Sequence, residues 1–268
     1  MILIGDCLSK LKEVPSESVQ TCVTSPPYWG LRDYDDSGQL GQEDHPEQFV
    51  SKLTEIFEEV RRVLKDDGTL WLNIGDTYFG AKGGHYDKNS ITNSTTGIEY
   101  RQKRAAPPKH AYLKDGDLSG VPWMFAVEMQ KHGWYLKQDI IWHKPNPMPE
   151  AVNNRCVKSH EYIFLFTKKK QYYFNADAIK IKDVRRGSVW TFNTASLKEA
   201  HFAVFPTELP ALCIKAGSRE GDIVLDPFLG SGTTALVAQE LGRRWIGIEL
   251  NPDYIEIIKR RTPQTPLF

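Results

Sequence analysis

Short apolar runs alternate with amphipathic stretches along most of this chain. Seven of these runs predict strands, at residues 2–4, 19–23, 69–74, 139–142, 161–167, 223–225 and 245–248. Strands that alternate with amphipathic helices are typical of a mainly parallel sheet covered by helices on both faces. The pattern therefore predicts an α/β fold built on a doubly wound, mainly parallel, seven-stranded sheet.

The clearest predicted helix follows the second strand. Its apolar face is formed by Phe49, Leu53, Ile56, Phe57, Val60 and Leu64. Asp44 and Glu47 resemble a capping pair at its start, and Asp67-Gly68 is predicted to end it. Further helices are expected at residues 121–132, 206–216 and 232–241, each followed by a glycine, and a last one begins at Asn251-Pro252.

Residues 80–119 and 175–194 fit no predicted element. Long stretches without regular structure inside a compact domain are usually functional or disordered. The length of 268 residues suits one domain that spans 1–268 and carries such insertions.

The composition is that of an ordinary globular protein, with 40% hydrophobic and 25% charged residues. No run resembles a signal peptide or a membrane span, and the four cysteines lack metal-binding or disulfide spacing. We therefore expect a cytoplasmic protein without a metal site. The formal net charge of zero weakens a nucleic-acid interpretation, although basic residues cluster near 101–114, 168–170 and 180–186.

The sequence Thr24-Ser-Pro-Pro-Tyr28 follows the second strand and has a specific chemical use. Proline offers a carbonyl acceptor without a backbone N–H, Ser25 adds a second acceptor, and Tyr28 adds a flat ring. Together these groups suit a planar ring that carries an amino group. The alternative is a Pro-Pro turn with a tyrosine in the core.

A second motif, Asp226-Pro-Phe-Leu-Gly-Ser-Gly-Thr-Thr234, joins a strand to a helix. Such a glycine turn lets a ligand approach the backbone at a helix N-terminus. The next strand ends in Glu249, where dinucleotide folds hold ribose hydroxyls. The alternative is a plain strand-turn-helix connection with a surface glutamate.

Ligands of doubly wound sheets bind outside the carboxyl ends of the strands, near the switch point. Four strands end at Asp226, Glu249, Asp6 and Ser25. If the C-terminal strand neighbours the N-terminal one, these side chains line one crevice.

The ordered set of motifs resembles the S-adenosylmethionine-dependent amino-methyltransferases of DNA, in the subgroup whose catalytic motif precedes the cofactor motif. The matching pieces are Thr24-Ser-Pro-Pro-Tyr28, Leu70-Trp-Leu-Asn-Ile-Gly-Asp76, residues 133–147, Ser159-His-Glu-Tyr-Ile-Phe-Leu-Phe166, His201-Phe-Ala-Val-Phe-Pro206 and Asp226-Pro-Phe-Leu-Gly-Ser-Gly-Thr-Thr234. The resemblance implies a Rossmann-like methyltransferase sheet, circularly permuted, with inserted target-recognition segments at 80–119 and 175–194.

The resemblance also implies roles for individual residues. Catalysis on the amino group of a flipped base falls to Ser25, Pro26, Pro27 and Tyr28. The residues expected at the cofactor are Asp6, Cys7, Phe205, Asp226, Phe228, Gly230, Ser231, Gly232, Thr233 and Glu249. Ser25 in place of Asp or Asn favours cytosine N4 over adenine N6. The residues expected at DNA are Arg101, Lys103, Arg104, Lys144, Asn146, Arg155, Arg185 and Arg186.

The expected partners are double-stranded DNA and a possible cognate restriction endonuclease, for a monomer or homodimer encoded by a prokaryote or phage. Four alternatives stay open at this point: a DNA methyltransferase that acts on adenine N6, a nicotinamide-dependent dehydrogenase, a catalytically silent DNA-binding protein, and methylation of a protein glutamine.

Overall fold

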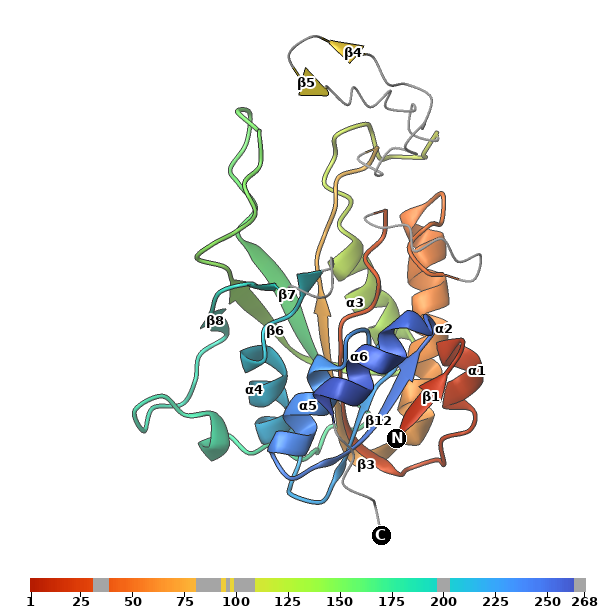
Figure 1. The fold of residues 1–268 in the computed structure, drawn as a ribbon, viewed down its shortest axis with the longest axis vertical. Helices are drawn as coiled ribbons and strands as arrows, with labels where there is room; N and C mark the ends of the chain where they lie inside the picture. Colours follow the sequence, from red (N-terminus) through yellow and green to blue (C-terminus); the bar gives the residue numbers. More distant parts are fainter. Residues whose placement is uncertain (31–38, 81–92, 95–96, 99–108, 197–202, 263–268) are drawn as a thin grey trace.

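In the computed structural model, one sheet forms the centre of the molecule and helices cover both faces (Figure 1). The structure describes residues 1–30, 39–80, 93–94, 97–98, 109–196 and 203–262. The strands of the sheet are β1 (Ile2–Ile4), β2 (Val19–Thr24), β3 (Leu64–Ile74), β6 (Tyr135–His143), β7 (His160–Thr167), β8 (Val189–Thr191), β11 (Ile223–Asp226) and β12 (Arg244–Glu249). The helices are α1 (Cys7–Leu11), α2 (Pro46–Val63), α3 (Val121–Lys131), η1 (Asp177–Ile179), α4 (Glu208–Gly217), α5 (Thr233–Glu240) and α6 (Asp253–Arg261).

The strand order is β1-β12-β11-β2-β3-β7-β6-β8. Among the described strands of this sheet, only β7 runs antiparallel to its neighbours, so the predicted α/β fold with a mainly parallel sheet is confirmed. The prediction of seven strands is wrong, because β8 adds an eighth at the edge. β8 lies within 175–194, where no element was predicted; it is three residues long, and only Trp190 of them is buried.

The first and last strands of the chain lie side by side, as predicted. β1 pairs with β12, and β11 pairs with β2 through Val224 with Thr21 and Leu225 with Cys22. From the boundary between β11 and β2, successive strands of the chain are therefore added toward opposite sides of the sheet: β12 follows β11 on one side, and β3 follows β2 on the other. This boundary is the topological switch point. Because β7 is reversed, its amino end lies beside the carboxyl ends of the parallel strands. We call this end of the sheet, at which the parallel strands finish, its carboxyl edge.

Alternate residues of each strand enter two separate cores. Cys22, Leu70 and Phe164 pack with α1, α2 and α3, whereas Val23 and Trp71 pack with α4, α5 and α6. Both faces of the sheet are thus buried, which explains the almost continuous apolar runs of its central strands.

Helix α2 is amphipathic as predicted, but its boundaries differ. His45 and Gln48 form the capping box, not Asp44 and Glu47, because Pro46 already occupies the first turn. The helix ends at Val63 and β3 follows directly, so Asp67-Gly68 lies inside the strand. The helices expected at 121–132, 206–216, 232–241 and after Asn251 are confirmed as α3, α4, α5 and α6.

Helix α1 was not predicted. The Asp6 side chain caps it by accepting a hydrogen bond from the Ser9 amide at 2.9 Å. Two small antiparallel ladders complete the described elements, β4 (Asn93–Ser94) with β5 (Gly97–Ile98) and β9 (Ala195–Ser196) with β10 (Ala203–Val204).

Candidate functional site

The segment Ser25–Tyr28 follows the carboxyl end of β2, and hydrogen bonds of the two residues after it anchor it. The Gly30 amide donates to the Gly41 carbonyl at 2.8 Å, and Trp29 Nε1 donates to the Glu43 carbonyl at 2.8 Å. Trp29 is buried, whereas Ser25 and Tyr28 are partly exposed. These contacts anchor the chain directly after Tyr28, while Ser25 and Tyr28 stay accessible.

The ring of Tyr28 packs directly on the backbone at Gly75, the residue after β3. A Cβ added at Gly75 would lie 2.7 Å from Cε2 of Tyr28 and 3.4 Å from Cγ of Glu161. A Cβ atom essentially never comes closer than 3.0 Å to a non-bonded heavy atom, so the close approach requires glycine here. The Cδ2–Cε2 side of the Tyr28 ring therefore lies against the backbone just after β3.

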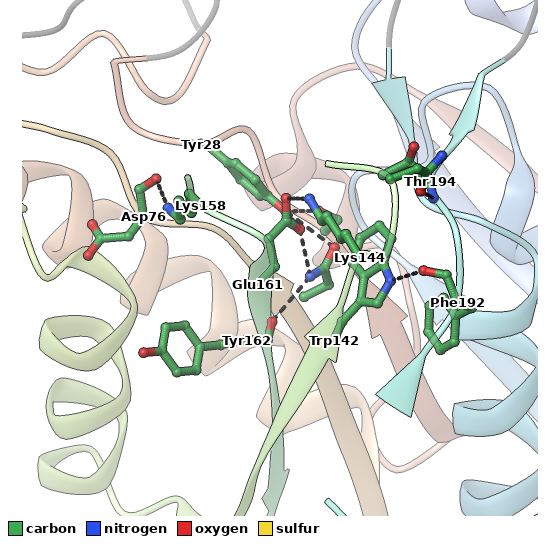
Figure 2. A network of polar contacts seen from close by, with 12 residues as sticks. Tyr28, Asp76, Trp142, Lys144, Lys158, Glu161, Tyr162, Phe192 and Thr194 are labelled. Atoms are coloured by element: carbon green, nitrogen blue, oxygen red, sulfur yellow. Dashed lines mark hydrogen bonds and ion pairs between the residues drawn. The ribbon is translucent and has the colours of Figure 1, made fainter. Parts of the chain in front are cut away.

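A network of polar groups surrounds the Tyr28 hydroxyl (Figure 2). The hydroxyl oxygen lies 2.6 Å from Glu161 Oε2, 3.2 Å from Asn73 Oδ1 and 3.4 Å from Ser25 Oγ. Asn73 Nδ2 also donates to Glu161 Oε2 at 3.0 Å. Lys144 forms an ion pair with Glu161 Oε1. The network thus joins the ends of β2, β3 and β6 to the start of β7.

A second polar group lies beside this network. Asp76 accepts hydrogen bonds from the Gly120 and Val121 amides at 3.0 and 3.1 Å, which holds the start of α3. Lys158 donates to the Asp76 carbonyl. Burial lowers the pKa of Lys158, while Asp76 and Glu161 act in the opposite direction. Burial also raises the pKa of Asp76.

The glycine turn begins at Asp226, which is buried at the end of β11. Asp226 Oδ1 accepts from Thr24 Oγ1 at 2.6 Å and from the Phe228 amide at 3.0 Å. Burial raises the pKa of Asp226 to about 6, against the effect of hydrogen bonds from Thr24, Thr234 and Phe228. Because Thr24 precedes Ser25, one hydrogen bond ties the glycine turn to the Ser-Pro-Pro-Tyr segment.

The turn itself is built to be approached by a ligand. Gly230 and Gly232 both have positive φ, and a Cβ at Gly230 would meet only the Phe228 carbonyl at 4.0 Å. Glu249 Oε2 accepts from the Gly230 amide at 2.7 Å, and burial raises the pKa of this carboxyl group. Arg261 Nη1 donates to the Ser231 carbonyl at 2.7 Å and to Ser231 Oγ at 2.8 Å. An open backbone beside a carboxylate fits a ligand that carries a ribose.

The other residues predicted at the cofactor, Asp6, Cys7, Phe205 and Phe228, differ in their surroundings. Asp6 lies at the same edge, but its carboxylate caps α1. Cys7 is buried, and burial raises the pKa of its thiol to about 12. Phe228 packs against the core of α1, α2 and α3, while Phe205 packs against the core of the opposite face. The two rings therefore lie on opposite sides of the sheet.

The residues predicted to contact DNA are dispersed. Arg101, Lys103 and Arg104 lie outside the described residues. The loop between β6 and β7, which rises from one end of the sheet in Figure 1, carries Lys144, Asn146 and Arg155.

Within this loop, Arg155 stacks on Tyr78 at 4.2 Å and pairs with Glu150 at 2.6 Å, while Asn146 Oδ1 accepts from the Thr194 amide at 3.0 Å.

Arg185 and Arg186 precede β8 and do not join this group. The carboxyl end of β8 pairs with His143, so its amino end points away from Lys144. Arg185 is exposed, and Arg186 Nε donates to the Ile179 carbonyl at 3.0 Å.

Sequence reasoning missed Asn73, Asp76, Lys158 and Glu161 as parts of this site. Asn73 and Asp76 could have been found, because they mark the carboxyl end of a strand in the same way as Asp226. Glu161 stands at the start of a strand and reaches the edge only because β7 is antiparallel.

Two further observations concern the described part of the chain. It contains no group of three or more His, Cys, Asp or Glu side chains that could hold a metal ion. None of its helices combines the length and the apolar character that crossing a membrane requires.

Known proteins resemble this chain over most of its length. The family of N6 and N4 DNA methylases matches residues 19–260. Type II methyltransferase M.SmaI of Serratia marcescens is 48% identical over 267 residues, which cover 97% of this chain and 89% of that protein.

Two solved structures share the fold. PvuII DNA methyltransferase, described as cytosine-N4-specific, aligns over 100% of this chain and 87% of its own, with a TM-score of 0.75 and 23% identity. A Thermus thermophilus protein described as a putative DNA modification methylase, complexed with S-adenosyl-L-methionine, aligns over 100% of this chain and 95% of its own, with a TM-score of 0.69 and 27% identity. The family match covers most of the chain and confirms the resemblance that the motifs indicated: this chain belongs to the N6/N4 DNA methylase family.

Proposed function

We propose that this chain moves a methyl group from S-adenosylmethionine to N4 of a cytosine flipped out of double-stranded DNA. The observation that carries the proposal is the 2.6 Å hydrogen bond between Thr24 and Asp226, because it holds the amino-binding segment beside the glycine turn. Membership of the DNA methylase family excludes the dehydrogenase alternative. Ser25 in the catalytic motif and the cytosine-N4 specificity given for PvuII methyltransferase, which shares the fold, support cytosine as the target.

The reaction makes demands that the chain's own residues meet. The exocyclic nitrogen is a poor nucleophile, since its lone pair is delocalised into the ring. Ser25 Oγ and the Pro26 carbonyl would accept hydrogen bonds from its two protons and orient the lone pair. Tyr28 would stack on the base, an interaction worth on the order of 1–3 kcal/mol. Positioning supplies the catalysis, so no cysteine nucleophile is needed.

S-Adenosylmethionine supplies a methyl group on a sulfonium, and several residues of the glycine turn would hold it. Asp226, Phe228, Gly230, Ser231, Gly232 and Thr233 form the turn, and Glu249 stands beside it for the ribose. Asp6 and Cys7 would contact the adenine through the backbone at the start of α1, since the Asp6 carboxylate already serves the helix. Phe205 would close the pocket from the face of α4. The complex of the Thermus relative with S-adenosyl-L-methionine supports this assignment.

The DNA would lie across the edge where the two motifs meet. Lys144, Asn146 and Arg155 flank this edge, and residues 80–119 and 175–194 are the proposed recognition insertions of one catalytic domain spanning 1–268. The neighbouring placement of β1 and β12 supports a circularly permuted arrangement of the methyltransferase sheet.

The wider setting follows from the relatives. M.SmaI is a type II methyltransferase, which supports a cognate restriction endonuclease as partner. We propose that the protein acts as a monomer or homodimer on DNA in the cytoplasm of a prokaryotic cell.

Methylation of mixed-sequence DNA by the purified protein tests the proposal. After incubation with S-adenosylmethionine carrying a deuterated methyl group, DNA is digested and its nucleosides are analysed by mass spectrometry. Labelled N4-methylcytosine, absent with Ser25→Ala, is the expected product. Labelled N6-methyladenine would contradict the choice of base, and unlabelled DNA would contradict the proposed activity.

A further inference from the structure

We infer that the Lys144–Glu161 ion pair is a positioning device for the target base. Through the Tyr28 hydroxyl, it fixes the ring on which the base stacks and the direction in which Ser25 offers its oxygen. The inference rests on the proposed function, because it concerns the same site. Glu161 lies 133 residues from Tyr28 in the chain, outside the Ser-Pro-Pro-Tyr motif.

The Tyr28 hydroxyl has one proton, for which Glu161 Oε2 and Asn73 Oδ1 both serve as acceptors. Glu161 Oε2 is closer, at 2.6 Å against 3.2 Å for Asn73 Oδ1, and a carboxylate is the stronger acceptor. The proton therefore points at Glu161, and the lone pairs of the Tyr28 oxygen face Ser25 Oγ at 3.4 Å. The Ser25 hydroxyl donates toward Tyr28 in turn, which leaves its own lone pairs for an incoming amino group.

Glu161 is held on both carboxylate oxygens. Oε1 pairs with Lys144, and Oε2 accepts from Tyr28 and from Asn73 Nδ2 at 3.0 Å. The side chains of Lys144 and Glu161 are only 16% and 14% exposed, so solvent screens this pair weakly. The carboxylate cannot rotate away from Tyr28 without losing several of these contacts.

Lys144 is itself supported from the far side. Its ammonium lies 4.4 Å from the centre of the Trp142 ring. Trp142 stacks on Phe192 at 5.4 Å, and its Nε1 donates to the Phe192 carbonyl at 2.9 Å. The Thr194 amide donates a hydrogen bond to Oδ1 of Asn146, which follows Lys144 by two residues in the chain. The segment after β8 therefore braces the ion pair, a role separate from DNA recognition.

A double-mutant cycle on the rate constant of methyl transfer tests the inference. Glu161→Gln, Tyr28→Phe and the double variant are compared with the wild type in single turnovers at saturating DNA and S-adenosylmethionine. Each single variant should be slower by about tenfold, the effect of one hydrogen bond to a charged group. The double variant should be no slower than the slower single one, because Glu161 acts through the Tyr28 hydroxyl.

A merely structural Glu161 would behave differently. The fold-decrease in the rate constant caused by Glu161→Gln would then multiply with that of Tyr28→Phe in the double variant, or Glu161→Gln would leave the rate constant unchanged. Either result would overturn the inference. The affinity for S-adenosylmethionine should stay within about twofold, since β2 and β3 separate β7 from β11. The matched control is Glu59→Gln, which breaks an ion pair with Arg62 on α2 and should leave the rate unchanged.

Two further sets of variants are used: one replaces Glu161→Gln if that variant does not fold, and the other tests the role of Lys144. If Glu161→Gln does not fold, Glu161→Asp runs the same cycle, because it keeps the charge and withdraws the carboxylate by about 1.5 Å. Lys144→Met should slow transfer as Glu161→Gln does, and Lys144→Arg should restore it. Wild-type protein that methylates no DNA would overturn the proposed function as well, whereas an active wild type with multiplying effects would overturn only this inference.

Discussion

The seat of Tyr28 on Gly75 makes Gly75→Ala the most informative single substitution. The added Cβ would lie 2.7 Å from Cε2 and 3.1 Å from Cδ2 of the Tyr28 ring, whereas an ordinary contact needs at least 3.4 Å. The ring must therefore retreat by about 0.7 Å. Its hydroxyl is held by Glu161 at 2.6 Å, so the ring tilts about this anchor instead of moving as a whole.

A tilt of this size changes where the stacked base presents its amino group. Misplacement of reacting groups by about 1 Å costs up to about a hundredfold in rate. We expect Gly75→Ala to slow single-turnover methyl transfer by between about tenfold and about a hundredfold. The dissociation constant of S-adenosylmethionine, measured by isothermal titration calorimetry, should not change, because Gly75 lies at the end of β3 and the glycine turn follows β11.

Gly217→Ala is the matched control for a steric clash elsewhere. Its Cβ would lie 2.6 Å from Thr69 Oγ1 and 2.8 Å from Thr21 Oγ1, where the end of α4 packs on β2 and β3. This variant should lower Tm and keep the wild-type rate constant in the folded protein. A wild-type rate in Gly75→Ala, or an equal loss of rate in Gly217→Ala, would refute the reasoning.

Four further outcomes follow from the same contacts. Tyr28→Ala should cut turnover strongly and leave the affinity for S-adenosylmethionine intact; equal losses in both assays would mean that the ring does not serve the base. Burial raises the pKa of Asp226 to about 6 from the usual 3.8, so the folded state holds this proton to a higher pH than the unfolded state. The free energy of unfolding attributable to Asp226 therefore falls as pH rises from about 4 to about 6, and urea titrations should show that Asp226→Asn lacks this decline. Arg261→Lys, which cannot donate to the carbonyl and hydroxyl of Ser231 in the same way, should weaken S-adenosylmethionine binding by calorimetry; unchanged binding would mean that the turn needs no such support. Cys156 is the exposed cysteine and should react first with N-ethylmaleimide in mass spectrometry, and bound DNA should slow that reaction if the loop after β6 faces DNA.

Much of the fold could be predicted because each central strand is a buried apolar run that ends in a polar residue. Asp226, Glu249, Asp6 and Ser25 followed from this rule, and the strand order brings them to one edge. β8 could not be predicted, since Trp190 is its only buried residue and alternation over three residues carries little signal.

The polar network behind Tyr28 was harder to predict from sequence. The contact of Glu161 with Tyr28 depends on the reversed direction of β7, which an apolar run does not reveal. The local partner of Asp6 was also not predicted: its carboxylate accepts a hydrogen bond from the Ser9 amide and so caps the short helix that follows. His45, not Asp44, is the N-cap residue of α2, because Pro46 directly after it already occupies the first helical position.

In the proposed mechanism, one pocket holds the cofactor at the glycine turn and the target base at Tyr28. A crystal structure of the protein with sinefungin and an oligonucleotide that contains its target sequence tests this most directly. We expect the target cytosine outside the helix, stacked on Tyr28, with its amino nitrogen within hydrogen-bonding distance of Ser25 Oγ and the Pro26 carbonyl. That nitrogen should also lie about 3–3.5 Å from the sinefungin amine, which takes the place of the transferable methyl group. A target base that remains stacked in the duplex, or that lies away from Tyr28, would contradict the account.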